Sequence, residues 1–205
     1  MPKSTRTFVA IALPPPAASR LRRLQEELAP AFPAARWSPG EAFHLTLAFL
    51  GDVLDSDLHA VCRRVAEAAA PLRPFELSLE GVGVFPDPRR PRVIWAGLTA
   101  PDLAPLQAAQ RAVAEACKAA GYRPDDRFTP HVTLGRIRQD RRRPRPAPAD
   151  AAPADDPTAP FRGWTGGSFR ASSVVTFSST LDPEGPVYTP LATAPFAGKK
   201  IDASP

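Results

Sequence analysis

The chain contains 205 residues, of which 43% are hydrophobic and 23% are charged. These shares are those of an ordinary globular protein, so they exclude wholesale disorder, and the length suits one domain with two lobes. No run of about 18 apolar residues occurs, which excludes a membrane-spanning helix, and no signal-like apolar stretch lies within residues 1–11. We therefore expect a cytoplasmic protein that has no membrane partner.

The positive charge is concentrated in one segment. The chain carries a net charge of +5, and residues 136–145 contain six arginines and one aspartate, so this segment accounts for the whole excess. Such a segment either attracts a polyanion, because phosphate neutralisation supplies affinity, or forms a solvated charged loop. Residues 139–160 hold almost no large apolar side chain, which predicts a mobile loop, and residues 199–205 are expected to form a flexible tail.

Strand and helix patterns alternate in the first half of the chain. In chain order, they predict a strand over residues 8–13, a helix over 17–31, a strand over 43–50, a helix over 55–70 and a strand over 75–84. Ser56 is a candidate N-cap for the second helix. Cys62 and Cys117 lie in helical patterns without metal-ligand spacing, so both are expected to pack as small hydrophobic residues.

The second half repeats the first, with a strand over residues 92–98, a helix over 102–120 and a strand over 129–137. His44 follows the end of the first strand by 31 residues, and His131 follows the end of the corresponding strand by 33 residues. This similar spacing indicates an internal duplication. Further strands are predicted over 169–177 and 187–191, with a hairpin turn over 182–185.

These elements predict an α+β fold. Two strand–helix–strand units, related by a pseudo-twofold axis, would form antiparallel sheets around a central cleft, with the helices outside. We expect residues 1–198 to form a single bilobal domain and the protein to be a monomer.

Two of the three histidines open the same pattern, His44-Leu45-Thr46-Leu47 and His131-Val132-Thr133-Leu134. Alternate residues of a strand share a face, so each motif places its histidine and threonine on one side and its apolar residues on the other. A lone motif of this kind is more often a structural histidine. Two copies at equivalent points of a repeat instead favour one shared site.

Two imidazoles and two hydroxyls in one cleft suit phosphodiester chemistry without a metal. With an ordinary pKa of about 6.5, one histidine can accept a proton while the other donates one. The threonine hydroxyls can hydrogen-bond the non-bridging oxygens. Zinc is the chemical alternative, but no carboxylate lies at ligand spacing from His44 or His131, and His59 is expected on the exposed side of a helix. We therefore expect no metal.

The residues around the motifs carry a family resemblance. Arg36-Trp37 precedes the first motif, Phe49-Leu50-Gly51 follows it, and residues 91–97 (PRVIWAG) lie between the two motifs. Together with the paired motifs, they resemble the two-histidine phosphoesterase superfamily, and within it the bacterial and archaeal RNA 2′,3′-cyclic phosphodiesterases, also called 2′-5′ RNA ligases. The resemblance covers residues 7–196.

This resemblance implies hydrolysis of a terminal 2′,3′-cyclic phosphate of RNA to a 2′-phosphate, without metal or nucleotide cofactor. It also implies a weak, reversible joining of tRNA halves through a 2′-5′ linkage. His44 would donate a proton to the departing 3′ oxygen, His131 would accept one from water, and Thr46 and Thr133 would hold the phosphate. The alternative is a non-catalytic RNA- or nucleotide-binding module, which would favour Arg or Lys over two titratable imidazoles.

Phe49 and Arg136 occupy the same offset, five residues after the histidine of each motif. In the resembling family, an aromatic residue there can stack on the terminal base and an arginine can contact phosphate. Strict alternation turns an odd offset away from the histidine face, so a bulge or a strand end near Ala48 and Gly135 is required. Without such a bulge, Phe49 is a core residue.

Three arginines between the two motifs are candidates to line the RNA path: Arg89, Arg90 and Arg92. The first two equally suit a solvated turn. Ser178 stands where many members of the resembling family carry a basic residue, which would remove one charge from the phosphate side of the site.

Overall fold

A computed structural model describes residues 2–125, 127–137, 156–182 and 185–198. Its α-helices are α1 (Pro15–Leu28), α2 (Leu58–Ala69) and α3 (Ala104–Ala119). Its strands are β1 (Ser4–Ala12), β2 (Ala35–Trp37), β3 (His44–Leu54), β4 (Phe75–Phe85), β5 (Val93–Thr99), β6 (His131–Ile137), β7 (Thr165–Ala171), β8 (Ser173–Asp182) and β9 (Gly185–Pro195). Three short 3₁₀ turns, Ala29–Ala31, Gly40–Ala42 and Ala159–Phe161, complete the described elements.

The strands form one antiparallel sheet in the order β7-β4-β5-β6-β3-β1-β8-β9, and β2 pairs with β6. The sheet has two equivalent halves, with β6, β5 and β4 in one at the places of β3, β1 and β8 in the other. Within the described residues, one pair joins β3 to β6, Leu45 opposite Val132, and β2, which lies between α1 and β3 in the chain, adds three pairs with β6. The predicted α+β fold of two strand–helix–strand units, β1–α1–β3 and β5–α3–β6, is therefore confirmed.

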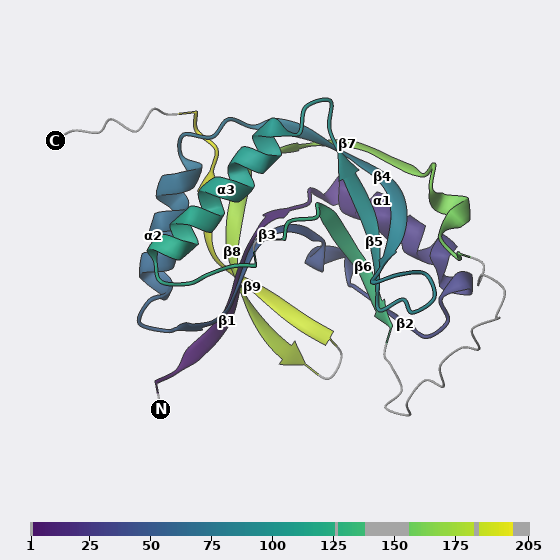
Figure 1. Cartoon of the computed structure of the whole chain (residues 1–205), viewed down its shortest axis with the longest axis horizontal. Coiled ribbons are helices and arrows are strands. Elements are labelled where there is room, and N and C mark those ends of the chain that lie inside the picture. Colours follow the sequence, from purple (N-terminus) through teal and green to yellow (C-terminus); the bar gives the residue numbers. More distant parts are fainter. Residues whose placement is uncertain (1, 126, 138–155, 183–184, 199–205) are drawn as a thin grey trace.

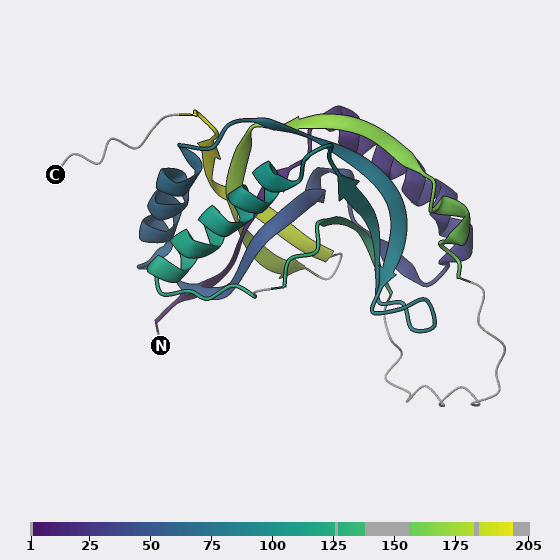
Figure 2. The same ribbon diagram turned by 45° about the horizontal axis from the view of Figure 1, so that its top comes forward.

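The helices cover the outer side of the sheet and exchange between the units. α2 and α3 lie side by side, with α3 against β3 and α2 against β8 and β9, whereas α1 packs against β7 in the other half (Figures 1 and 2). α3 of the second unit thus covers β3 of the first unit, and α1 of the first unit covers β7 in the half of the sheet that contains the second. This exchange couples the folding of the two halves, because neither half can bury its apolar face alone.

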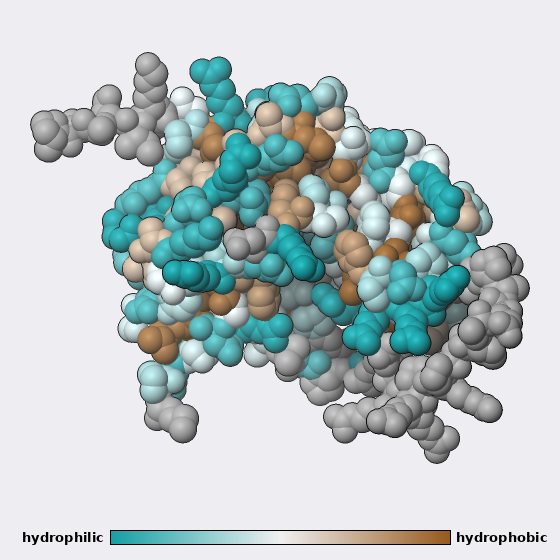
Figure 3. Space-filling model, viewed as in Figure 1, coloured by the Kyte–Doolittle hydropathy of each residue, from teal (hydrophilic) through white to brown (hydrophobic). Residues whose placement is uncertain are grey.

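The spacing of apolar residues along the helices and strands explains how the helices pack against the sheet. In α1, Leu21, Leu24 and Leu28 recur at helical spacing and are fully buried. On β3, Leu45 and Leu47 are buried in the core while His44 and Thr46 remain partly exposed on the opposite face. The hydrophobic effect therefore determines which face of the central strands is free for a site. In the space-filling view of Figure 3, the surface is recessed between the two halves.

The first two helices differ from prediction at their ends. α1 begins earlier than expected because Pro15 and Pro16 occupy its first turn, where a missing N–H costs nothing. It gives way to a 3₁₀ turn at Ala29, since Pro30 cannot donate the next helical hydrogen bond. Ser56 is not the N-cap of α2: that position belongs to Asp57, and the Ser56 hydroxyl donates to the Asp57 carboxylate at 3.0 Å.

The predicted strand over residues 169–177 is wrong. It is two strands, β7 and β8, which lie in different halves of the sheet: β7 pairs with β4, and β8 pairs with β1. The chain crosses between the halves at Ser172, a change that alternating polarity cannot signal. The predicted hairpin is confirmed, because Asp182 of β8 pairs with Gly185 of β9.

Residues 156–160, at the far end of the loop predicted over residues 139–160, form a polar turn. Asp156 accepts hydrogen bonds from the backbone N–H and hydroxyl of Thr158 at 2.9 and 2.7 Å, and from Arg162 at 2.9 Å. Thr158 itself is buried. A polar turn therefore orders residues 156–160 without large apolar side chains. The remainder of that loop and the predicted tail over 199–205 lie outside the described residues. No helix of the described chain is long and apolar enough to cross a membrane.

A close backbone approach in the second half gives a test of this packing. A Cβ added at Gly97 of β5 would collide with the carbonyl oxygen of Glu80 in β4, and a backbone oxygen in a sheet cannot move aside. We expect Gly97→Ala to lower the free energy of unfolding by about 1–3 kcal/mol, as overpacking does, measured by urea denaturation. Gly163→Ala is the control, because its Cβ would face open space. Equal midpoints for both variants would contradict the close approach.

Candidate active site

The two histidine motifs lie side by side on the central strands. Because Leu45 of β3 is opposite Val132 of β6 in an antiparallel pair, Thr46 lies across from His131 and His44 lies across from Thr133. Opposed residues have Cβ atoms about 5 Å apart. All four side chains are partly exposed on the face opposite the core. We call this face, defined by these four residues, the cleft.

A hollow of about 230 Å³ opens at the His131 end of the cleft. Thr46 of β3 and His131 of β6 both line it, together with Phe49 and Phe85. Side chains of the two motifs therefore meet in one cavity, although they are more than 80 residues apart in the sequence. Its volume suits a small group such as a phosphate with part of a nucleoside.

Both imidazoles are anchored in the same way. Nδ1 of His44 lies 2.7 Å from the carbonyl oxygen of Ala42, and Nδ1 of His131 lies 2.7 Å from that of Thr129. A carbonyl oxygen can only accept, so each Nδ1 carries a proton and donates it. The free nitrogen of each ring is then Nε2, which accepts a proton when the ring is neutral and donates one when it is charged. Either ring can therefore act as acid or base through Nε2.

Aromatic side chains surround each histidine, and sequence reasoning missed them. His44 contacts Phe8 of β1 at 4.8 Å between ring centroids and the edge of Tyr188 of β9 at 5.1 Å, with Phe177 of β8 at 6.2 Å. These rings hold the imidazole plane and exclude water from one side of it. Phe8 and Tyr188 come from opposite ends of the chain, so no local pattern could have placed them beside His44.

On the other half, His131 contacts Phe85 of β4 at 5.1 Å and Trp95 of β5 at 6.5 Å. Trp95 belongs to the PRVIWAG segment, whose tryptophan was the one available sequence signal. Among the described residues, its indole Nε1 is a buried donor without a hydrogen-bond partner. The surroundings of His131 are thus less crowded by rings than those of His44.

Burial makes both histidines weak bases in the free protein. Desolvation lowers the pKa of His44 to about 4; the hydrogen bond to Ala42 opposes this shift, and repulsion from Arg136, and from His131 when that ring is charged, reinforces it. Desolvation also lowers the pKa of His131, again with a contribution from Arg136. At neutral pH both rings are therefore neutral. An anion bound in the cleft would favour the charged forms and raise both pKa values.

Two β-bulges change the side of the sheet to which the residues after the two histidine motifs point. In the pairing of β1 with β3, Leu47 is left without a partner between Thr46 and Ala48. In the pairing of β5 with β6, Leu134 is left over in the same way. The structure thus contains the irregularities that the positions of Phe49 and Arg136 require.

As a result, Phe49 and Arg136 both approach the cleft. Phe49 is 42% exposed and lines the hollow with Thr46 and His131, so it is not a core residue. Arg136 is exposed at the equivalent point of β6, and its charge influences both histidines. The two halves therefore offer an aromatic ring on one side and a guanidinium on the other.

The other candidate arginines lie farther from the cleft than Arg136. Arg92 is exposed just before β5, where its carbonyl accepts from Ile137 N–H at the end of β6, and it does not line the hollow. Arg89 and Arg90 lie in the β4–β5 turn, where Asp87 accepts their backbone N–H groups. Ser178 faces β9, and its hydroxyl donates to the carbonyl of Thr189 at 3.3 Å.

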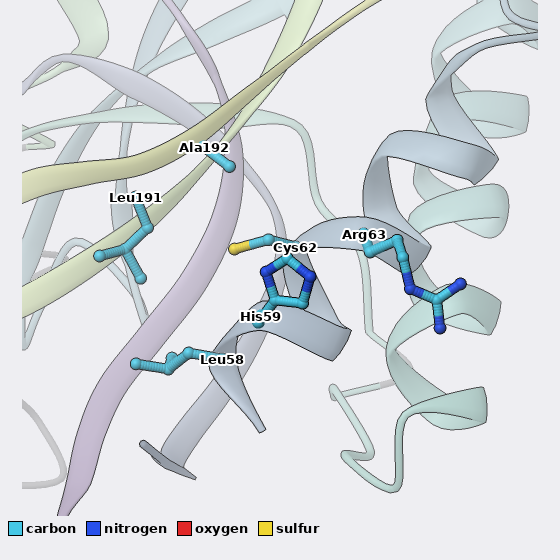
Figure 4. A pocket seen from close by; sticks show the side chains of 6 residues that line it. All are labelled: Leu58, His59, Cys62, Arg63, Leu191 and Ala192. Atoms are coloured by element: carbon cyan, nitrogen blue, oxygen red, sulfur yellow. The ribbon is translucent and has the colours of Figure 1, made fainter. Parts of the chain in front are cut away.

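His59 lies on the outer surface, as expected, but beside a second hollow of about 450 Å³ between α2 and β9 (Figure 4). Cys62 is partly buried and lines that hollow, so it is not wholly a core residue, whereas Cys117 is fully buried. In Figure 4, Arg63 points away from Cys62 and Leu191. Within the described chain, no group of three or more His, Cys, Asp or Glu side chains is placed to hold a metal ion.

Comparison with known proteins gives the same assignment as the motifs. The family model described as LigT like phosphoesterase matches residues 11–95 and 98–188. A relative from Methanothermobacter thermautotrophicus, named RNA 2′,3′-cyclic phosphodiesterase, is 32% identical over 184 residues, covering 90% of this chain and 95% of the relative. A relative of the same name from Archaeoglobus fulgidus is 32% identical over 189 residues, covering 91% and 97%.

Solved structures share the fold. TT0787 of Thermus thermophilus superposes with a TM-score of 0.75 at 27% identity, covering 95% of this chain and all of that one. LigT of E. coli, complexed with 3′-AMP, superposes with a TM-score of 0.69 at 25% identity, covering 95% and 99%. The chain therefore belongs to the LigT-like phosphoesterases, within the two-histidine superfamily that its paired motifs predict.

Proposed function

We propose that this protein is an RNA 2′,3′-cyclic phosphodiesterase that hydrolyses a terminal cyclic phosphate to a 2′-phosphate by acid/base catalysis without a metal. The observation that carries the proposal is the matched pair of imidazoles, each with Nδ1 committed to a backbone carbonyl and Nε2 free at the cleft. A pair of this kind suits one proton removal and one proton delivery in the same reaction. The names of its relatives point the same way.

In the proposed step, a water oxygen attacks phosphorus while His131 Nε2 accepts the water proton. The new P–O bond forms as the bond from phosphorus to the 3′ oxygen breaks, and His44 Nε2 delivers a proton to that oxygen. The products are a 2′-phosphate and a free 3′ hydroxyl. Thr46 and Thr133 would donate hydrogen bonds to the non-bridging oxygens, where negative charge must be stabilised.

His44 must take up its proton when the substrate binds. Its pKa of about 4 leaves the ring neutral in the free protein at pH 7, whereas a proton donor must be charged. A cyclic phosphate anion bound between His44 and Arg136 would offset the charge of Arg136 and favour the imidazolium. Substrate binding and proton uptake would therefore be linked.

The same groups support two further parts of the proposal. Arg136 would contact phosphate, Phe49 would stack on the terminal base, and Arg92 would meet the RNA farther from the cleft. A 5′ hydroxyl could take the place of water: its oxygen would attack phosphorus and lose its proton to His131 while the bond to the 3′ oxygen breaks and His44 protonates that oxygen. The site would thereby join RNA ends, tRNA halves among them, through a 2′-5′ linkage, and because acid and base exchange roles when a reaction runs backwards, the same groups would also reverse this joining. A binding module alone would not need two oriented Nε2 atoms, so hydrolysis is the favoured function.

The catalytic pair can be tested against the third histidine. We expect His44→Ala and His131→Ala each to lower turnover of RNA ending in a 2′,3′-cyclic phosphate by about 10²-fold or more, as loss of general acid/base catalysis does. His59→Ala is the matched control, because His59 lies outside the cleft. The assay contains EDTA and separates 2′- from 3′-phosphate products. Full activity in either cleft variant, or a 3′-phosphate product, would refute the mechanism.

The lowered pKa of His44 predicts a pH-dependent stability. The unfolded chain takes up this proton near pH 6.5 and the folded chain only near pH 4, so between these values the unfolded state binds more protons. The free energy of unfolding should therefore fall as the pH falls through this window, and less steeply in His44→Gln. Urea denaturation in phosphate-free buffer measures the difference. An NMR titration of the His44 ring near pH 6.5 would contradict the predicted shift.

A further inference from the structure

Arg6 of β1 lies beside the cleft and has no role in the proposed hydrolysis. Its guanidinium carbon is 4.9 Å from the centroid of the Phe49 ring. Asp52 is directly across from Arg6 on β3, yet within the described residues Arg6 forms no ion pair. Within the part of the chain that the structure describes, the guanidinium is therefore held by the aromatic ring, and no carboxylate lies within ion-pair distance of it.

Arg6 is close to the reacting groups of the site. Phe49, on which it stacks, lines the hollow with Thr46 and His131. The charge of Arg6, like that of Arg136, also acts on Tyr188, whose ring contacts His44 at 5.1 Å. Arg6 therefore extends the positive potential of the cleft beyond Phe49, on the half that lacks a counterpart of Arg136.

The duplication shows that Arg6 is an addition specific to one half. Phe8 pairs with Phe49 in the first half as Val93 pairs with Arg136 in the second. By this register, Arg6 corresponds to Pro91, which carries no charge. The shared architecture therefore does not require an arginine here, and a role in binding explains it better than a role in the fold.

We propose that Arg6, stacked on Phe49, binds the phosphodiester group next to the reacting cyclic phosphate. The preferred substrate is then the end of an RNA strand of at least two nucleotides, and a cyclic mononucleotide is a poorer one. This inference rests on the proposed function.

The chemistry of the guanidinium fits this task. Stacking uses its flat face, whereas its N–H donors lie in the plane and remain free for the paired oxygens of a phosphate. The terminal base would stack on the open part of the Phe49 ring, and the phosphate that leads to the preceding nucleotide would then meet Arg6. One ring and one charge would thus recognise base and backbone together.

The test compares two substrates with the same end, adenosine 2′,3′-cyclic phosphate and an adenosine dinucleotide ending in that group. We expect the wild type to prefer the dinucleotide, and Arg6→Gln to lower the ratio of the two kcat/KM values about tenfold, mainly through KM. The dependence of dinucleotide binding on salt should weaken by about one unit of log–log slope. Arg6→Lys should recover most of the ratio at low salt, because it retains the charge.

Arg23→Gln on α1 is the matched control, since it removes one exposed positive charge that is not at the cleft. Urea midpoints of all variants verify that they are folded. An equal loss on both substrates, or no loss on either, would overturn the role of Arg6 in binding a second phosphate, as would a wild type without preference for the dinucleotide.

Failure of the proposed function has a different signature, namely a wild type that hydrolyses neither substrate. In that case, calorimetry with adenosine 2′-phosphate and the dinucleotide that carries a terminal 2′-phosphate decides the inference by binding alone. Weaker binding of only the dinucleotide by Arg6→Gln would support a second phosphate contact. Equal affinities in the variant and the wild type would reject it.

Discussion

The pairing of Leu45 with Val132 is the contact on which the site depends. Both residues are fully buried, so the alternation of each strand directs His44, Thr46, His131 and Thr133 to the opposite face. A slip of one residue in this register would bury the histidines and expose the leucines, at a large cost in apolar burial. The hydrophobic core therefore places the four polar side chains on one face, and the Nδ1 hydrogen bonds of the two histidines then orient their rings.

Symmetry supplies the two acid/base groups, and departures from symmetry distinguish them. The Nδ1 hydrogen bonds of His44 and His131 are equal in length. Their surroundings differ, because the β8–β9 hairpin brings Phe177 and Tyr188 to His44, whereas Phe85 and Trp95 approach His131. Desolvation lowers the pKa of His44 to about 4, so His44 binds a proton weakly in the free protein, and its proposed role as donor depends on the anion that enters the cleft.

Local sequence patterns predicted most helices and strands of the fold. They failed where contacts between residues far apart in the chain determine the structure. The repeated spacing to the two histidines indicated the duplication, and the offset of Phe49 and Arg136 required bulges that the structure contains at Leu47 and Leu134. The passage from β7 to β8 at Ser172 was missed, because one alternating pattern continues while the chain changes sheet half. Residues 156–160 carry little apolar surface, and the turn that they form is held by hydrogen bonds of Asp156 with Thr158.

The sequence by itself determined the family, the two histidine–threonine pairs and the face on which they lie, because these depend on short motifs and on alternation within a strand. Only the tertiary structure decided what surrounds them. Phe8, Tyr188 and Arg6 reach the cleft through strand pairings between segments far apart in the chain. Desolvation and stacking depend on such pairings, so the proton affinity of His44 and the stacking of Arg6 on Phe49 are properties of the folded sheet.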